Sequence, residues 1–226
     1  MYKRQGIRWI RVLYCYPEEI YDELIETIRD EKKICHYLDI PIQHASDRIL
    51  KRMGRRTSKQ ELIDIVGKLR KEIPDIVLRT TLITGFPGET EEDHEELKEF
   101  VDEMEFDRLG VFTYSPEENT PAAEMADQVP EEVKEERRDE LMELQQEISY
   151  DRGQDRIGQE LLVMIEGKVA DESAYIGRTY GDAPKVDGYI FVQTGELLMT
   201  GDFAKVRVTG ALEYDLIGVL SDEYTE

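Results

Sequence analysis

Apolar, β-branched runs alternate with helical periodicities along the first 129 residues. The strand-like runs cover residues 6–16, 36–44, 76–84 and 107–116. Apolar positions at helical spacing predict helices over residues 17–30, 46–54, from 58 onward, and 91–104. Strands that alternate with helices form a parallel sheet with the helices packed against it. The sequence therefore predicts an α/β domain over residues 1–129, with about four βα units of a barrel-like fold.

The pattern changes after residue 129. Pro130 and two glutamates begin a long helix that ends near Gly153, which predicts a connector over residues 130–153. Short strand-like segments without helical period follow, near residues 160–167, 173–179, 189–194, 203–209 and 213–219. These segments predict a small all-β domain over residues 154–226, a closed barrel of OB-like size.

Alternate positions within the predicted strands differ in polarity. Leu38, Ile40 and Ile42 alternate with Asp39, Pro41 and Gln43, and Leu109 and Val111 alternate with Gly110, Phe112 and Tyr114. Because successive side chains of a strand point to opposite faces, one face of the sheet is predicted to be apolar and to suit the helix layer. The other face carries polar groups, among them Arg79 and Thr81. A buried guanidinium needs an anion, which is either the carboxylate of Asp39 or a ligand carboxylate.

The stretch IVLRTTLITGFPGET, residues 76–90, joins a strand, a turn and a helix. Gly85 and Gly88 lack a Cβ atom, so the backbone of the turn can approach a ligand closely. Thr90 and Asp93 have the spacing of a capping box for the helix that follows. A tight βα connection without a ligand explains the same residues, and both interpretations stay open at this point.

Chemically capable side chains gather where the predicted strands end. They are found in Tyr14-Cys15-Tyr16-Pro17, Gln43-His44, Gly85-Phe86-Pro87-Gly88 and Tyr114-Ser115-Pro116. In a barrel-like α/β domain these ends form the active-site edge. His44 can equally be a structural histidine, and Phe112 with Tyr114 can be core packing. The convergence of four strand ends favours a site more than any single residue does.

Charge and composition narrow the classes of partner. The chain has a net charge of −22, and residues 151–226 alone hold 7 Lys and Arg against 15 Asp and Glu, a net charge of −8. Such acidity opposes a phosphate backbone and favours either a basic partner or solubility alone. Cys15 and Cys35 predict reduced, buried thiols, and three histidines make a histidine metal site improbable. Since no apolar run approaches about 18 residues, we expect a cytoplasmic protein without a membrane span.

Four stretches carry a family resemblance. They are YLDIPIQHASDRILKRMGRR (37–56), LRTTLITGFPGETEED (78–93), DRLGVFTYSPEENTPAA (107–123) and GRTYGDAPKVDGYIFV (177–192). The chain resembles the radical S-adenosylmethionine (SAM) methylthiotransferases with a C-terminal TRAM domain, and within them most closely the RimO type. The alternative MiaB type, which modifies a transfer-RNA adenosine, typically has Ser-Gly after the glutamine and Arg-Pro-Gly where this chain has residues 117–119.

The resemblance implies a function, a cofactor and a partner. RimO enzymes place a methylthio group on the β-carbon of an aspartate in the twelfth small-subunit ribosomal protein, a basic partner that the acidic TRAM domain would attract. The cofactor-side residues implied for SAM are Gln43, Arg79, Thr81, Ile83, Gly85, Phe86 and Gly88, with Phe112 and Tyr114 beside the pocket. Arg79 would face the methionyl carboxylate.

One family feature is missing from this sequence. Family members hold a 4Fe-4S cluster on a Cys-x3-Cys-x2-Cys loop, and this chain has no such motif. We therefore expect the C-terminal part of such an enzyme, a partial radical SAM barrel followed by the TRAM domain, without metal ligands and inactive by itself. The alternative is a non-catalytic module that only binds the substrate, and no catalytic residue is assigned.

Overall fold

The structure is a computed structural model in which residues 6–170 and 172–225 are described. The chain divides into two compact units, Met1–Gln145 and Gln146–Glu226. This division falls inside a long helix, whereas the sequence pattern predicts boundaries at residues 129 and 153. Each unit is described by itself.

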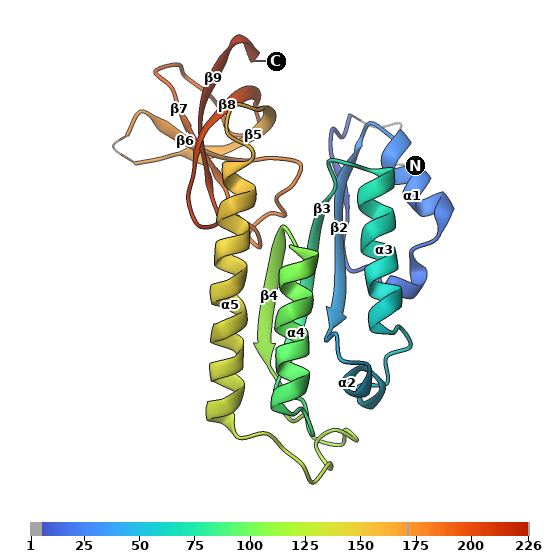
Figure 1. Cartoon of the computed structure of the whole chain (residues 1–226). Helices are drawn as coiled ribbons and strands as arrows, with labels where there is room; N and C mark the ends of the chain where they lie inside the picture. Colours follow the sequence, from blue (N-terminus) through green and yellow to red (C-terminus); the bar gives the residue numbers. More distant parts are fainter. Residues whose placement is uncertain (1–5, 171, 226) are drawn as a thin grey trace. The chain divides into compact units, whose positions relative to one another are not determined.

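Unit 1 is built on a four-stranded parallel sheet (Figure 1). Its strands are β1 (Ile10–Val12), β2 (Ile34–Gln43), β3 (Val77–Thr84) and β4 (Arg108–Thr113), in the spatial order β1-β2-β3-β4. The predicted parallel α/β architecture is confirmed. The first strand is shorter than the predicted run over residues 6–16, because Tyr14 has a φ of +62°, which ends the extended backbone.

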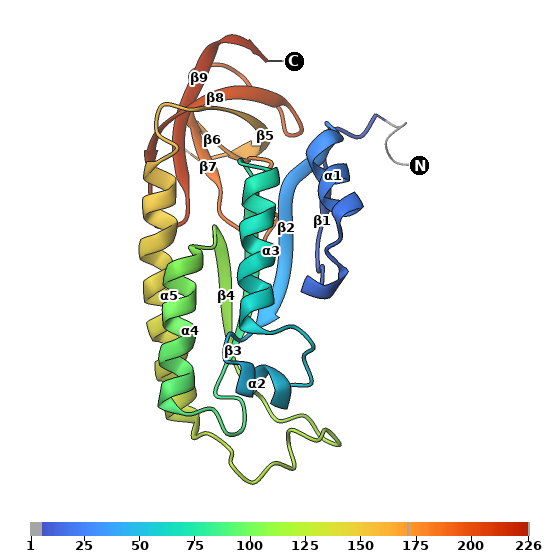
Figure 2. The same cartoon turned by 45° about the vertical axis from the view of Figure 1, so that its right-hand side comes forward.

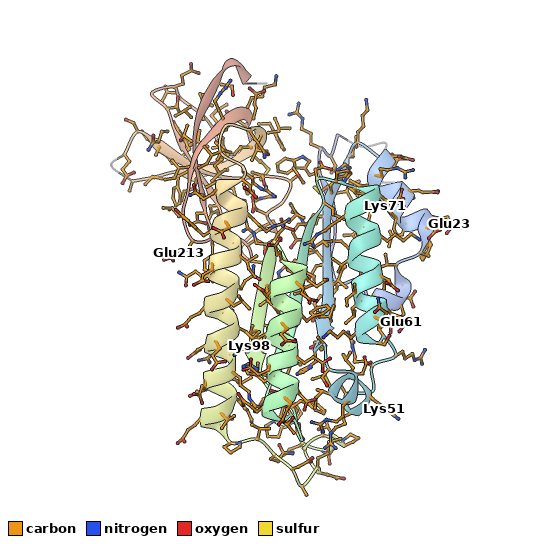
Figure 3. The ribbon with its side chains drawn as sticks, viewed as in Figure 1. Glu23, Lys51, Glu61, Lys71, Lys98 and Glu213 are labelled. Carbon is orange, nitrogen blue, oxygen red and sulfur yellow. The ribbon has the colours of Figure 1, made fainter. Side chains whose placement is uncertain are left out.

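Helices follow the strands as the periodicity predicts. They are α1 (Asp22–Asp30), α2 (Asp47–Arg52), α3 (Lys59–Glu72) and α4 (Glu91–Met104). The helix predicted over residues 17–30 is instead a short 3-10 turn, η2 (Pro17–Glu19), followed by α1. Figures 1 and 2 show α3 and α4 side by side in front of the strands. The predicted capping box of Thr90 with Asp93 is present on α4. A second box, of Ser58 with Glu61, begins α3 (Glu61 is labelled in Figure 3).

The core of unit 1 lies between the sheet and these helices. Leu38, Leu78 and Leu82 from the strands and Leu69 and Phe100 from the helices are completely buried. Burial alternates along β3 and β4 as predicted, and Leu38, Ile40 and Ile42 of β2 are buried on this face. In β2 the alternate positions Asp39 and Pro41 are buried as well, so burial does not alternate there. The opposite face of the sheet is therefore left to the polar positions.

The long helix α5 (Glu131–Gln154) begins in unit 1. Leu141 is completely buried, and the Gln145 side chain donates to the backbone oxygen of Phe106 at 2.8 Å. Lys98 of α4, labelled in Figure 3, donates to Glu140 of α5 at 2.9 Å. The buried side of α5 in unit 1 thus combines apolar packing with ion pairs rather than forming a purely apolar stripe.

Unit 2 contains a closed five-stranded barrel. Its strands are β5 (Glu160–Lys168), β6 (Ala174–Arg178), β7 (Ile190–Gln193), β8 (Phe203–Ala211) and β9 (Leu216–Thr225), in the order β5-β6-β7-β9-β8. β7 and β9 are parallel and the other pairs are antiparallel. Its hydrophobic core includes Val163, Ile165, Ile190, Val192 and Val206. The predicted OB-like closed barrel is confirmed.

The exposure of the two cysteines and the length of the helices bear on two of the predictions. Neither cysteine belongs to a disulfide, and only Cys35 is buried. The prediction that Cys15 is buried is wrong, because Cys15 lies half-exposed just after β1 at the edge of the sheet. Across the described part of the chain, no helix has both the length and the apolar character to cross a bilayer.

Candidate functional site

The polar face of the unit 1 sheet is organised around Arg79. Its Nη1 donates to the carboxylate of Asp39 at 3.1 Å and to the hydroxyl of Thr81 at 3.2 Å. Asp39 and Arg79 are register partners on β2 and β3, so the sheet itself places the two charges together. Of the two anions that the sequence left open for Arg79, the structure supplies the internal one, Asp39. The further role of Arg79 toward a ligand carboxylate stays a prediction.

Gly110 leaves space beside this ion pair. A Cβ atom at Gly110 would lie 3.6 Å from Nη2 of Arg79 and 3.9 Å from Cε2 of Phe112, so both side chains flank the same point of the sheet. Phe112, the last residue but one of β4, is 60% exposed. A guanidinium, a carboxylate, a hydroxyl and an open aromatic ring thus share one face. We call Asp39, Arg79, Thr81, Gly110 and Phe112 the sheet-face group.

The turn after β3 has the backbone conformation that its glycines predict. Gly85 and Gly88 have φ values of +70° and +82°, a region that disfavours residues with a Cβ atom. A Cβ at Gly85 would overlap Cγ of Lys134, and one at Gly88 would lie 2.5 Å from Oδ2 of Asp127 and 2.9 Å from Cζ of Arg52. Side chains of this protein therefore lie against both glycines, in the space that the sequence analysis offered to a ligand. A role of either glycine in ligand binding stays a prediction.

Phe86 and Tyr114 lie together at the ends of β3 and β4. Their ring centroids are 5.2 Å apart at 70°, and Ile49 of α2 and Ile83 of β3 pack against them. β4 ends at Thr113, and the Tyr114 amide still donates to the backbone oxygen of Thr84 at 2.8 Å. That Phe112 and Tyr114 flank one pocket stays a prediction. Tyr114 is 9% exposed and Phe112 is 60% exposed. Tyr114 thus packs in this aromatic cluster, whereas the ring of Phe112 is open to solvent.

Gln43 ends β2 in a left-handed conformation, with a φ of +72°, and is half-buried. The next residue, His44, is completely buried, and its Nδ1 accepts a hydrogen bond from the Ser46 amide at 2.9 Å. This contact supports the structural interpretation of His44 that the sequence kept open. Gln43 lies at the carboxyl end of the sheet, as predicted, and its role toward a ligand stays a prediction.

Asp93 ties the start of α4 to the start of α2. Its carboxylate accepts hydrogen bonds from the Ser46 hydroxyl at 2.7 Å, from the Thr90 amide at 2.8 Å and from Arg48. Burial opposes the charged form, but the bonds from Arg48, Thr90 and Ser46 more than offset it. They hold the pKa of the Asp93 carboxyl well below its usual range. This carboxylate is a fixed anchor and is ionised at every physiological pH.

Comparisons with known proteins match both units of the chain. The family model described as "Radical SAM superfamily" matches residues 2–101, and the model described as "TRAM domain" matches residues 157–220. A curated protein of Lachnoclostridium phytofermentans, named "Ribosomal protein uS12 methylthiotransferase RimO", is 66% identical over 94% of this chain. The chain belongs to the RimO type of radical SAM proteins. A Clostridium botulinum protein of the same name is 54% identical over 99% of this RimO-type chain.

The coverage of these relatives is partial. The chain spans about half the length of the curated relatives it matches, 48% and 50% of the two named above. Among solved structures, coproporphyrinogen III oxidase (HemN) from Escherichia coli, a radical SAM enzyme, is similar with a TM-score of 0.54 at 16% identity. That alignment covers 88% of this RimO-type chain and 46% of HemN, and it shows a shared fold only.

Three charged residues of this RimO-type chain were not found by the sequence reasoning, namely Glu89, Lys134 and Arg137, all of them buried around the turn after β3. Glu89 directly follows the turn, and Lys134 and Arg137 are three residues apart on α5. The sequence does show that Lys134 and Arg137 are three residues apart, which places both cations on one side of the helix. That side could not be assigned to the turn without the tertiary structure.

Proposed function

We propose that this chain supplies the SAM-facing sheet and the substrate-recognition barrel of a RimO-type methylthiotransferase that acts on ribosomal protein uS12. The support is that one chain joins a radical SAM segment to a TRAM domain and is similar over almost all of its length to proteins of that name. The reaction implied is transfer of a methylthio group to the β-carbon of an aspartate. A protein that modifies ribosomes works in the cytoplasm, which is the proposed location.

The sheet-face group is the observation that supports SAM binding. The methionyl end of SAM carries a carboxylate and an ammonium, and Arg79 with Asp39 offers one partner of opposite charge to each. The exposed ring of Phe112 offers a surface on which an adenine can stack. The residues present therefore fit SAM, with Arg79, Asp39, Thr81 and Phe112 holding it. When bound, SAM supplies the methyl group and the radical chemistry of the family.

The iron-sulfur cluster of the family does not fit the residues of this chain. Such clusters are held by several thiolates close together in space, and the chain has two cysteines, Cys15 and Cys35, separated by nineteen residues. Within residues 6–170 and 172–225, no group of three or more His, Cys, Asp or Glu could hold a metal ion. We therefore propose that the 226-residue chain binds SAM and substrate without cleaving the cofactor.

The barrel of unit 2 is proposed to bind the basic ribosomal protein. Residues 151–226 have a net charge of −8, which attracts a basic protein and repels transfer RNA. Leu197 and Met199, 91% and 72% exposed, stand in the loop between β7 and β8. Hydrogen bonds order this loop, including those from the Leu198 amide to the Tyr175 hydroxyl and from the Met199 amide to Asp202. A charged rim with an ordered apolar tip suits a protein partner.

Replacement of Arg79 tests the cofactor site. Arg79→Ala should weaken SAM binding to this chain by about tenfold or more, because a charge-assisted hydrogen bond is lost. Isothermal titration calorimetry measures this change. Arg138→Ala, an exposed arginine on α5 that pairs with Asp139, is the matched control and should leave the affinity unchanged. Equal affinities for the Arg79 variant and the unmodified chain would contradict the assignment.

A further inference from the structure

Glu89 is a completely buried carboxylate that bridges the turn after β3. Its Oε2 accepts the amide of Gly85 at 2.7 Å and the amide of Phe86 at 3.2 Å. These two amides belong to the backbone where β3 turns left-handed at Gly85. Because one carboxylate oxygen accepts both amides, it fixes the orientation of both peptide groups.

Arg137 of α5 is the counterion of this carboxylate. Its Nη1 lies 3.0 Å from Oε1 of Glu89 and 3.3 Å from the Glu89 backbone oxygen, and its Nη2 donates to Glu91 at 3.1 Å. The side chain of Arg137 is only 7% exposed. Taking a carboxylate out of water is costly unless an opposite charge and hydrogen bonds compensate, and Arg137 provides both.

The other candidate partner of Glu89 does not reach it. Nε2 of His44 is 3.6 Å from Oε2 of Glu89, beyond hydrogen-bonding distance. Nδ1 of His44 already accepts the Ser46 amide, so in the neutral ring Nε2 carries the proton. Among the described residues, this buried Nε2 has no hydrogen-bond partner. Arg137 is thus the group whose charge and donors hold Glu89 in place.

Lys134, one turn earlier on α5, contacts the same place. Its Nζ donates to the backbone oxygen of Tyr114 at 2.9 Å, and its own backbone oxygen accepts the Thr84 hydroxyl at 3.1 Å. Its aliphatic stem fills the space over Gly85. The first turns of α5 therefore brace the end of β3, the turn and the end of β4 from the same side.

We infer that Arg137 is a positioning residue for the turn at residues 85–88, and that it acts through Glu89. It keeps the Gly85 and Phe86 amides in one orientation at the carboxyl end of β3, the strand that also carries Arg79 and Thr81 of the proposed SAM site. This inference rests on the proposed function only where SAM is concerned. The conformation of the turn can be measured without any ligand.

Amide hydrogen exchange tests the inference on the full chain. Arg137→Met removes the charge and the donors and keeps most of the volume, and it should speed exchange at Gly85 and Phe86 by at least tenfold. Arg138→Met, the exposed neighbour on the same helix, is the matched control and should leave both amides unchanged. The Leu78 amide, which donates to Asp107 at 2.9 Å, reports on the sheet and should also be unchanged.

A second pair of variants guards against misfolding. Arg137→Met leaves a buried carboxylate without its counterion, whereas Arg137→Met with Glu89→Gln removes both charges. The double variant should fold and should still exchange faster at Gly85, and Arg137→Lys should restore part of the protection. The effects of the two substitutions should not add, because both act on one hydrogen-bonded unit. Additive effects would contradict the inference.

Titration with SAM separates this inference from the proposed function. Arg137→Met should weaken SAM binding at least fivefold relative to Arg138→Met. If the unmodified chain binds no SAM, the proposed function fails, and the exchange data still decide the role of Arg137. Unchanged exchange at Gly85 and Phe86, or an equal rise at Leu78, would overturn the positioning role.

Discussion

At the scale of single residues, the register of the sheet decided what the sequence left open. The strand alternation predicted that Arg79 faces away from the helices and needs an anion, and it named Asp39 or a ligand. Asp39 and Arg79 are register partners, and their side chains pair at 3.1 Å. Alternation along one strand specifies a face, but the pairing of two strands specifies the neighbour.

Gly85 shows how a glycine can serve the fold itself. Its φ of +70° disfavours a Cβ atom, and Lys134 occupies the space where that atom would be. Gly67, in contrast, lies in the middle turns of α3 on its exposed side, and nothing lies within 4 Å of a Cβ position there. As residues in a sequence the two glycines are alike, but the turn requires a glycine at position 85, whereas α3 does not require one at position 67.

Matched alanine substitutions test this contrast. Gly85→Ala should lower the free energy of unfolding of unit 1 by about 2 kcal/mol or more, from backbone strain and overlap. Gly67→Ala should raise it by about 0.5–1 kcal/mol, because alanine is the better helix former. Urea unfolding followed by the fluorescence of Trp9, the single tryptophan, measures both. A Gly85→Ala variant as stable as the unmodified chain would show that the turn can relax.

At the scale of elements, strand and helix types followed the sequence closely, and their ends did not. The capping boxes at Ser58 and Thr90 begin α3 and α4 where predicted, because a cap is a local hydrogen-bond arrangement. β1 pairs with β2 at Ile10 and Val12, and the left-handed backbone at Tyr14 prevents it from continuing. β4 likewise ends at Thr113, one residue before Tyr114. Element ends depend on tertiary partners, and the sequence pattern carries little of that information.

The closed barrel depends on two glycines, Gly218 and Gly177, at positions where a neighbouring strand leaves no room for a Cβ atom. A Cβ at Gly218 of β9 would lie 2.5 Å from Cγ1 of Val206 and 2.8 Å from the backbone oxygen of Arg207. At Gly210 of β8 the nearest atom would be 3.8 Å away. Gly177 on β6 is crowded in the same way by Val163. Small barrels need such positions because their strands bend sharply to close the sheet.

Substitution at these positions tests the closure of the barrel. Gly218→Ala should destabilise the barrel by about 1–3 kcal/mol, because the rigid backbone and a buried valine must move. Gly210→Ala is the matched control and should change stability by less than about 0.5 kcal/mol. Amide hydrogen exchange of β5 to β9 reports the stability of unit 2 separately from unit 1. Equal protection of these amides in both variants would show that the barrel accommodates a Cβ atom at Gly218 and would contradict the prediction.

At the scale of the whole molecule, charge is the property that bears on partners. The net charge of −22 is distributed over both units, since residues 151–226 account for −8 of it. Attraction of a basic protein to such a surface extends about 10 Å at 0.1 M salt and about 6 Å at 0.3 M salt. Binding of the proposed ribosomal partner should therefore depend on ionic strength.

A salt titration tests this prediction. The affinity of the chain for purified uS12 should fall by about tenfold between 50 and 300 mM NaCl, mainly through a slower association rate. Surface plasmon resonance at several salt concentrations measures both rates. Transfer RNA serves as the control ligand and should not bind at physiological salt. Salt-independent binding of uS12, or binding of transfer RNA, would contradict the proposed electrostatic recognition.

The amino-acid sequence by itself determined the order and type of the elements, the apolar face of the sheet, the helix caps, the closed barrel and the acidic charge. These features depend on periodicity, on local hydrogen bonds and on composition, all of which can be read along the chain. Only the tertiary structure decided that Asp39 pairs with Arg79, that Tyr114 packs against Phe86, and that Arg137 and Lys134 reach the turn after β3. Those contacts join residues about 30 to 50 positions apart, and their formation depends on how the elements pack, which no local pattern specifies.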